Sequence, residues 1–129
     1  MEAFLTDVGA GARTPWSTTG LEVLGPRDFS GGRLQRSGTN VVCFSAEWCP
    51  VTRRFMPKFL ALRGTLPALL MIADITDLKS PLWDDFHIRI TPSIIVYREG
   101  EVFLRLDGRR FFGLRDPDMA KLAMALPPH

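Results

Sequence analysis

Two short apolar runs, separated by a segment with helical spacing, set the predicted structure of the first half of the chain. Residues 40–45 and 68–75 are compact and mostly apolar, which is typical of buried central strands. Between them, in residues 49–63, apolar side chains recur every three or four positions among charged ones, which predicts an amphipathic helix that ends at Gly64. Pro57 lies inside this helix and predicts a kink about one turn upstream.

The second half of the chain predicts a short helix, a two-stranded hairpin and a terminal helix. Their expected limits are residues 77–86, 93–107 and 116–126. A polar residue followed by proline begins each helix, with Ser80 in the first and Asp116 as the expected N-cap of the second. Strands that alternate with helices and are followed by a hairpin predict an α/β fold, with a central mixed sheet of four to five strands flanked by helices on both faces.

The start of the chain has weaker patterns. Residues 1–20 show no sustained period and contain several glycine, serine and threonine residues, so we expect an extension that is flexible or loosely packed. A single domain is expected at residues 21–129. Within it, residues 21–24 suggest a short strand, and residues 26–29 suggest a weak helix that a Gly-Gly pair interrupts.

Composition and charge exclude several functional classes. A net charge of +2, with basic residues scattered along the chain, is too small for a nucleic-acid-binding surface. The longest apolar stretch, residues 66–73, is far shorter than the roughly 20 residues of a membrane-spanning helix. Residues 1–20 lack the basic start and apolar run of a secretory signal, so we expect a cytoplasmic protein unless a signal has been removed. We also expect a monomer.

Cys49 carries the clearest chemical signal. A buried strand is expected to lead into this cysteine, which begins a helix, and the free amides and dipole of a helix N-terminus stabilise a thiolate. Such sites lower the pKa of a cysteine from about 8.5 to roughly 3.5–7.5. Pro50 suits the first helical position, and the Thr52 hydroxyl could donate a hydrogen bond to the sulfur. On Cys49 alone, a structural cysteine that packs near Trp48 is the alternative.

Further motifs resemble the thioredoxin superfamily. The run Ala46-Glu47-Trp48-Cys49 matches the start of its active-site signature, Pro57 falls at its helix proline, and residues 86–92 look like the segment that ends in its cis-proline. Further matches in spacing are the hairpin turn Glu99-Gly100 and the later Gly108. The resemblance covers about residues 21–126 and implies a thioredoxin-like fold.

The resemblance also implies how the site is built. It makes Cys49 the nucleophile that attacks a disulfide. It implies that the Thr91–Pro92 peptide bond is cis, and that the backbone of Thr91 pairs with a bound substrate strand. The residues that it places along the substrate groove are Trp48, Pro50, Thr91, Pro92 and Gly108.

Two positions depart from the superfamily's pattern. Thr52 stands where a dithiol enzyme carries its resolving cysteine, so it cannot form an internal disulfide with Cys49. Cys43 stands where many thioredoxins hold a buried acid that assists the resolving cysteine. The family's geometry places Cys43 beneath Thr52 rather than beside Cys49, which disfavours a Cys43–Cys49 bridge without excluding it. The two changes together indicate a site that has lost dithiol chemistry.

These observations lead to three hypotheses of function. The first is a monothiol protein of the disulfide isomerase or deglutathionylation type, with Cys49 and Thr52 as catalytic residues. It would act on protein or small-molecule disulfides, with glutathione as an external co-substrate and no bound cofactor. The alternative is a redox-inactive binding or chaperone-like module, so whether the chain is an enzyme stays open. A monothiol glutaredoxin with an iron–sulfur cluster is weaker, because the residues around Cys49 follow the thioredoxin pattern.

Two further polar sites are expected to carry no chemistry. Asp84 and Asp85 are expected on a solvated helix face, because no histidine or cysteine lies at ligand spacing, and we infer no metal. His87 is expected at the surface, away from Cys49.

Overall fold

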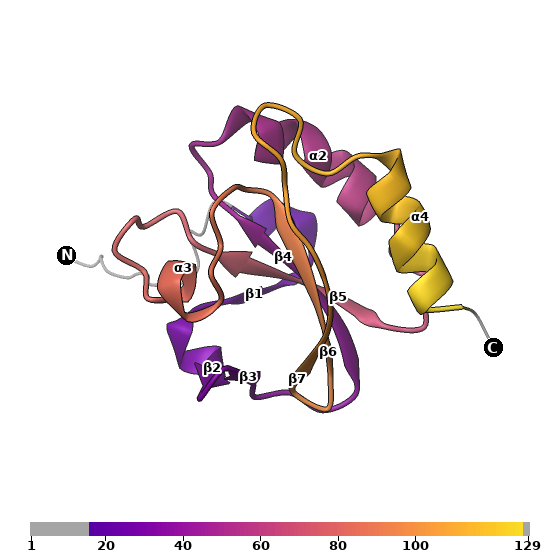
Figure 1. The fold of residues 1–129 in the computed structure, drawn as a ribbon, viewed down its shortest axis with the longest axis horizontal. Helices are drawn as coiled ribbons and strands as arrows, with labels where there is room; N and C mark the ends of the chain where they lie inside the picture. The colour runs from indigo at the N-terminus through magenta and orange to yellow at the C-terminus, as the bar shows by residue number, and fades with distance from the viewer. Residues whose placement is uncertain (1–15, 128–129) are drawn as a thin grey trace.

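The fold is built on one mixed five-stranded sheet with the strand order β1-β5-β4-β6-β7 (Figure 1). The computed structural model describes residues 16–127, and residues 1–15 of the predicted extension lie outside the described part. The strands of this sheet are β1 (Glu22–Leu24), β4 (Thr39–Ser45), β5 (Leu69–Asp74), β6 (Ser93–Arg98) and β7 (Glu101–Leu106). Strands β1, β5 and β4 run parallel, whereas β6 is antiparallel to both β4 and β7. The predicted mixed α/β sheet is confirmed.

Helices cover both faces of the sheet, as the sequence predicts. They are α2 (Pro50–Leu60), α3 (Leu82–Asp85) and α4 (Asp116–Ala125), with short 3₁₀ turns at η2 (Ser17–Thr19) and η3 (Pro26–Asp28). Figure 1 shows α2 and α4 together on one side of the sheet and α3 on the other. Side chains of the central strand β4 alternate between the two layers. Cys43 packs in the cluster with α2 and α4, whereas Phe44 packs in the cluster with α3.

A small hairpin replaces part of the predicted weak helix near residue 30. Strands β2 (Phe29–Ser30) and β3 (Arg33–Leu34) pair antiparallel, and the helical turn before them stops at Asp28. The reason is the Gly31-Gly32 pair, in which both residues have positive φ angles, +59° and +78°. Two consecutive residues with positive φ form the tight turn that joins two strands, so the glycines start a hairpin instead of only breaking a helix.

Several predicted limits differ from the structure at helix ends. The last turn after α2 has hydrogen bonds between residues three apart, such as Leu62 N to Phe59 O, so the α-helix stops before residue 63. The prediction of Asp116 as an N-cap is wrong by one residue. Arg115 is the N-cap of α4, and its backbone amide donates to Asp118 Oδ2 at 2.9 Å.

Residues 16–20, which the sequence assigns to the loose extension, are packed against the domain. The indole ring of Trp16 is buried in the core cluster that α2 and α4 cover. The Arg63 guanidinium donates to the backbone oxygen of Thr19 at 2.6 Å, which ties this segment to the end of α2. A large apolar ring followed by a capped turn therefore extends the ordered domain to at least Trp16.

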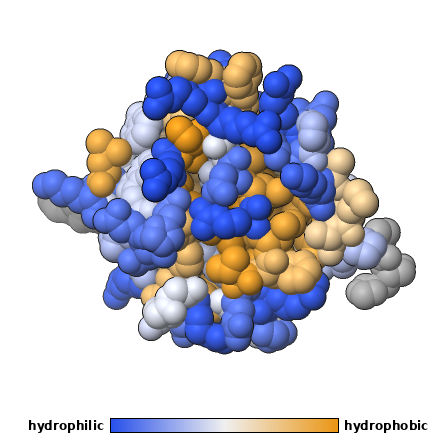
Figure 2. All heavy atoms as spheres, in the orientation of Figure 1, coloured by the Kyte–Doolittle hydropathy of each residue, from blue (hydrophilic) through white to orange (hydrophobic). Residues whose placement is uncertain are grey.

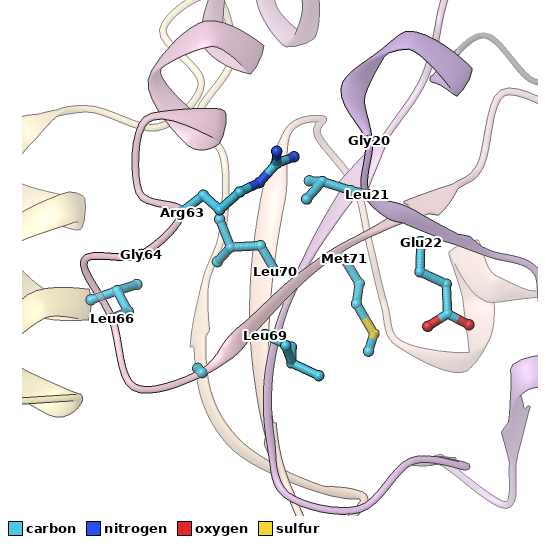
Figure 3. A pocket seen from close by; sticks show the side chains of 10 residues that line it. Gly20, Leu21, Glu22, Arg63, Gly64, Leu66, Leu69, Leu70 and Met71 are labelled. Carbon is cyan, nitrogen blue, oxygen red and sulfur yellow. The ribbon is translucent and has the colours of Figure 1, made fainter.

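A hollow of about 460 Å³ lies at the edge of the sheet formed by β1 and β5 (Figure 3). Its lining is mostly apolar and includes four leucines, together with the charged side chains of Arg63 and Glu22. Leu69 marks the amino end of β5, whereas Cys49 follows the carboxyl end of the parallel strand β4. The hollow and the thiol therefore lie toward opposite ends of the sheet. No helix in residues 16–127 is long and apolar enough to cross a membrane.

Candidate functional site

Cys49 lies at the point where β4 ends and α2 begins. It is the N-cap of the helix, and Pro50 occupies the first helical position, as the sequence predicts. The backbone amide of Cys49 donates to Ala46 O at 3.1 Å, and its carbonyl accepts from Arg53 N at 3.1 Å. Only 9% of the residue is exposed. The turn therefore holds the thiol at the surface end of α2, with little freedom to move.

The surroundings of Cys49 favour its thiolate. Burial raises the pKa of Cys49, but the Thr91 side chain, the Thr52 side chain and the backbone amides of Thr52 and Val51 lower it by more. The net pKa therefore lies below its ordinary value. The two amides belong to the first turn of α2, whose N-terminus attracts negative charge.

Thr52 is buried directly below this turn. Its hydroxyl oxygen is inaccessible to solvent and has no hydrogen-bond partner of ordinary geometry, yet the side chain still lowers the pKa of Cys49. A buried hydroxyl without a partner is costly, so a thiolate at Cys49 gives it the acceptor that a thiol supplies only weakly. Thr52 therefore places a hydroxyl, and not a second sulfur, near Cys49.

Thr91 and Pro92 face Cys49 from the start of β6. The peptide bond between them is cis. The Cys49 thiol donates to the carbonyl oxygen of Thr91, with 3.5 Å between sulfur and oxygen. Two hydrogen bonds of the Ser93 hydroxyl fix this bend, since it donates to Ile90 O at 2.7 Å and accepts from Gly108 N at 2.9 Å. The structure thus brings together residues that are about forty positions apart in the sequence.

Trp48, which precedes Cys49, presents its aromatic ring at the surface. Half of the residue is exposed, and its indole Nε1 donates to Thr76 O at 2.9 Å. The ring stacks on Trp83 of α3, with 6.3 Å between ring centroids and 14° between the planes. Trp83 Nε1 in turn donates to Asp77 O at 3.2 Å. Both indoles are anchored by their polar ends, so the exposed face of Trp48 is held rigidly.

The thioredoxin family model matches residues 22–114, which is most of the chain. The chain belongs to the thioredoxin family. Thiol redox chemistry is the general function that this membership supports. No match is found among curated protein sequences.

Solved structures show the same fold at low sequence identity. Oxidised mitochondrial thioredoxin 3 of Saccharomyces cerevisiae has a TM-score of 0.65 and 14% identity, covering 88% of this chain and 100% of that one. Thioredoxin f2 of Chlamydomonas reinhardtii has a TM-score of 0.65 and 19% identity, covering 85% and 100%. A chain from a study of thiol resolution in yeast mitochondrial 1-Cys peroxiredoxin has a TM-score of 0.64 and 16% identity, covering 84% and 97%. These likenesses extend the fold assignment over the whole domain.

Cys43 lies in the core of this thioredoxin domain and is separated from the chemistry at Cys49. It is fully buried, and burial raises its pKa to about 12, although the Ser45 hydroxyl at 3.4 Å lowers it. Both cysteines are free, with no disulfide between them. Cys43 therefore stays a protonated, inert thiol at any ordinary pH.

The loop at residues 109–113 also borders the site of this thioredoxin-family protein, although sequence reasoning did not assign it a role. A Cβ atom placed on Gly113 would lie 2.5 Å from Val51 Cγ1 and 3.2 Å from Pro92 Cδ, so the loop backbone rests directly on these two neighbours of the thiol site. Trp83 was also missed as a site residue. The available signal for the loop was the Phe-Phe-Gly run between a strand and a helix, an apolar pair at a position where a polar loop is usual.

The other polar residues that the sequence singles out are at the surface. Asp84 and Asp85 belong to α3 and are exposed, and His87 is exposed with a φ of +52°. Among residues 16–127, no three His, Cys, Asp or Glu side chains lie together as a possible metal site.

Gly108 is expected to be essential for the packing of the groove. A Cβ at this position would lie 2.2 Å from Pro92 O, so Gly108→Ala should lower the free energy of unfolding by about 1–3 kcal/mol through overpacking. Gly25→Ala is the matched control, because a Cβ there meets nothing within 4 Å and the backbone is extended. Urea unfolding of both variants measures the effect. Equal midpoints for the two variants would contradict this packing argument.

Proposed function

We propose that the protein performs thiol–disulfide exchange with a single cysteine and relies on an external thiol to complete each cycle. The observation that carries the proposal is a thiol with a lowered pKa at the start of α2, facing Thr91, without a second sulfur able to release it. The chain contains two cysteines, and the other, Cys43, is fully buried with a raised pKa. Thr52 supplies a hydroxyl where a resolving thiol would be needed.

The reaction would proceed in two exchanges. The Cys49 thiolate attacks one sulfur of a substrate disulfide, forms a mixed disulfide with it, and expels the other sulfur as a thiolate, which takes a proton from solvent. A glutathione thiolate then attacks the substrate sulfur of the mixed disulfide, which frees the Cys49 thiolate and leaves a substrate–glutathione disulfide. If the substrate's own thiol attacks instead, the result is isomerisation. Starting from a glutathionylated substrate, attack on the glutathione sulfur gives deglutathionylation and finally oxidised glutathione.

The groove supports an exchange reaction in a second way. The Cys49 sulfur lies at hydrogen-bond distance from the carbonyl oxygen of Thr91, which marks one edge of the path that an extended substrate would follow. The ring of Trp48, the residue before Cys49, is half exposed and held in place by Thr76 and Trp83. A disulfide bound beside Thr91 and Trp48 would meet the thiolate at close range, which is the main requirement for a fast displacement.

The test is the rate of reduction of a glutathionylated peptide at increasing glutathione concentration. Wild type should accelerate the reaction only when glutathione is present, Cys49→Ser should fall to the uncatalysed rate, and Cys43→Ala should retain the activity. Acceleration that persists in Cys49→Ser would reject the proposal, and so would a wild-type rate equal to the uncatalysed one.

A binding module without turnover is the second candidate. It is favoured by Thr52 in place of the second sulfur and by a core thiol, Cys43, in place of an acid. In that case Cys49 would be a groove residue only, and Cys49→Ser would leave substrate binding and the cellular phenotype unchanged.

A further inference from the structure

Two phenylalanine side chains project into solvent beside the groove. They belong to the loop at residues 109–113, called here the Phe-Phe loop, which joins β7 to α4 and passes over the start of α2 in Figure 1. Phe111 is 76% exposed and Phe112 is 61% exposed. Figure 2 shows hydrophobic atoms among strongly hydrophilic ones along this edge. Adjacent, highly exposed aromatic rings have no packing role in the domain, which is typical of a surface that another molecule covers.

Backbone hydrogen bonds hold the Phe-Phe loop in a defined conformation. Arg109 and Gly113 pair as an isolated bridge, with Gly113 N donating to Arg109 O at 2.7 Å and Arg109 N donating to Gly113 O at 3.1 Å. Phe111 has a φ of +71°, a left-handed conformation that a bulky residue rarely adopts. An unfavourable backbone conformation that displays an apolar ring to solvent indicates a functional reason for its placement.

The anchoring of the loop couples it to the thiol site. Gly113 is buried against Val51 and Pro92, and Pro92 follows the residue whose carbonyl accepts from Cys49. Phe112 and Val51 also line one small hollow with the exposed side of α2. A chain segment that covers Phe112 would therefore lie next to Val51 and Pro92, which border Cys49.

The charge around the Phe-Phe loop indicates the chemistry of that segment. The exposed arginines on the Phe-Phe loop and beside it are Arg54, Arg109, Arg110 and Arg115. Arg109 and Arg115 line one hollow together with Asp116 and Asp118. Within residues 16–127, none of these arginines is in an ion pair with an acidic side chain. The Arg115 guanidinium lies over the ring of Phe112, 5.2 Å from its centroid. The protein as a whole has a net charge of only +2, so this cationic surface is local.

The helix that holds Trp83 carries the reverse charge. Asp84 and Asp85 follow Trp83 in α3, and the Asp77 carbonyl anchors the Trp83 ring. An acidic bound segment is therefore attracted to the side of the Phe-Phe loop and repelled from the side of Trp48 and Trp83.

We infer that the Phe-Phe loop docks protein substrates whose reactive cysteine is flanked by apolar and acidic residues. The apolar side chains cover Phe111 and Phe112, the carboxylates meet the surrounding arginines, and the cysteine reaches Cys49 through the groove. This inference rests on the proposed exchange reaction for its biological role, although docking itself requires no redox step.

The test measures binding in the full-length Cys49→Ser protein, so that no exchange can occur. The probes are fluorescent peptides in which serine replaces the reactive cysteine, one with Phe, Leu, Asp and Glu around the serine, the other with lysine in place of both acids. The acidic peptide should bind at least about tenfold more tightly than the lysine peptide, and its affinity should fall with added salt. Replacing both Phe111 and Phe112 by serine, or Arg110→Glu, should each weaken it about tenfold.

Phe103→Ser is the matched control. Phe103 lies on β7, is 42% exposed and has the Arg98 guanidinium 3.7 Å from its ring centroid, so it is also an exposed phenylalanine beneath an arginine. Its loss should leave peptide affinity unchanged. Equal binding by the two peptides, or equal weakening by Phe103→Ser, would overturn the inference. Self-association that the double serine variant abolishes would also overturn it, because a second copy would then be the occupant.

The outcomes separate docking from chemistry. If the protein binds the peptide through the loop but shows no turnover, the docking proposal stands and the exchange reaction is rejected. If it shows turnover but no loop-dependent binding, the exchange reaction stands and the docking proposal is rejected.

Discussion

Thr52→Cys is expected to turn the proposed one-cysteine exchange, which stops at a mixed disulfide, into a dithiol reduction. Residue 52 lies three positions after Cys49, where side chains of a helical turn are neighbours and a disulfide can close. Well-oriented internal groups reach effective concentrations of roughly 10⁵ M or more, so release of the second substrate thiol without glutathione should rise at least a hundredfold. The measurement is a single turnover of reduced protein with a disulfide peptide.

The controls for this variant distinguish the effect of the new sulfur from the effect of a change in side-chain size. Thr52→Ser keeps a small polar side chain at the buried site and should behave like wild type, with no release of the second thiol. In Thr52→Cys, the product should contain a disulfide between residues 49 and 52 that peptide mapping identifies. A folded Thr52→Cys protein that never forms this disulfide would show that position 52 does not face Cys49 as the structure describes.

The second large effect is the difference in reactivity between the two cysteines. The pKa of Cys49 is lowered below its ordinary value, whereas burial raises the pKa of Cys43 to about 12. With an ordinary thiol near 8.5, at least about three units separate the two, so Cys49 should alkylate more than about a thousandfold faster at pH 8. Because only the thiolate reacts, the Cys49 rate should fall as the pH drops through a pKa that is lower than that of the same cysteine in urea.

Mapping of iodoacetamide-labelled peptides across a pH series measures this effect. Thr52→Val removes one of the groups that lower the pKa of Cys49 and should shift the profile to higher pH. In urea, Cys43 and Cys49 should react at similar rates, which shows that folding alone creates the difference. A Cys49 profile centred at or above the value in urea would contradict the description of an activated thiol.

The elements with a local signal were predictable from the sequence. The apolar run before Cys49, the Pro50 that starts α2 and the hairpin turn at Glu99 each depend on neighbouring residues, and the structure has them where the patterns indicate. One turn that depends on positive φ angles could not be predicted in this way. The β2–β3 hairpin depends on two glycines with positive φ, and the same residues are equally typical of a helix end.

The parts of the site that depend on distant contacts could not be read from any local pattern. Thr91 was placed opposite Cys49 only through the family resemblance, since about forty residues separate them. Stacking of Trp48 on Trp83 joins the turn after β4 to helix α3, and the contact of Gly113 with Val51 depends on the path of the loop after β7. Periodicity reports which face of an element is buried, but not which element lies against it.

The mass of the intact protein after one exposure to a disulfide substrate tests the central claim most directly. Reduced wild type, treated with an excess of a disulfide peptide and then quenched with acid, should gain one peptide, bound at Cys49. Addition of glutathione before the quench should remove it. An unmodified mass would contradict the account, as would peptide on Cys43 or a Cys49 adduct that is lost without glutathione by closure of a Cys43–Cys49 disulfide.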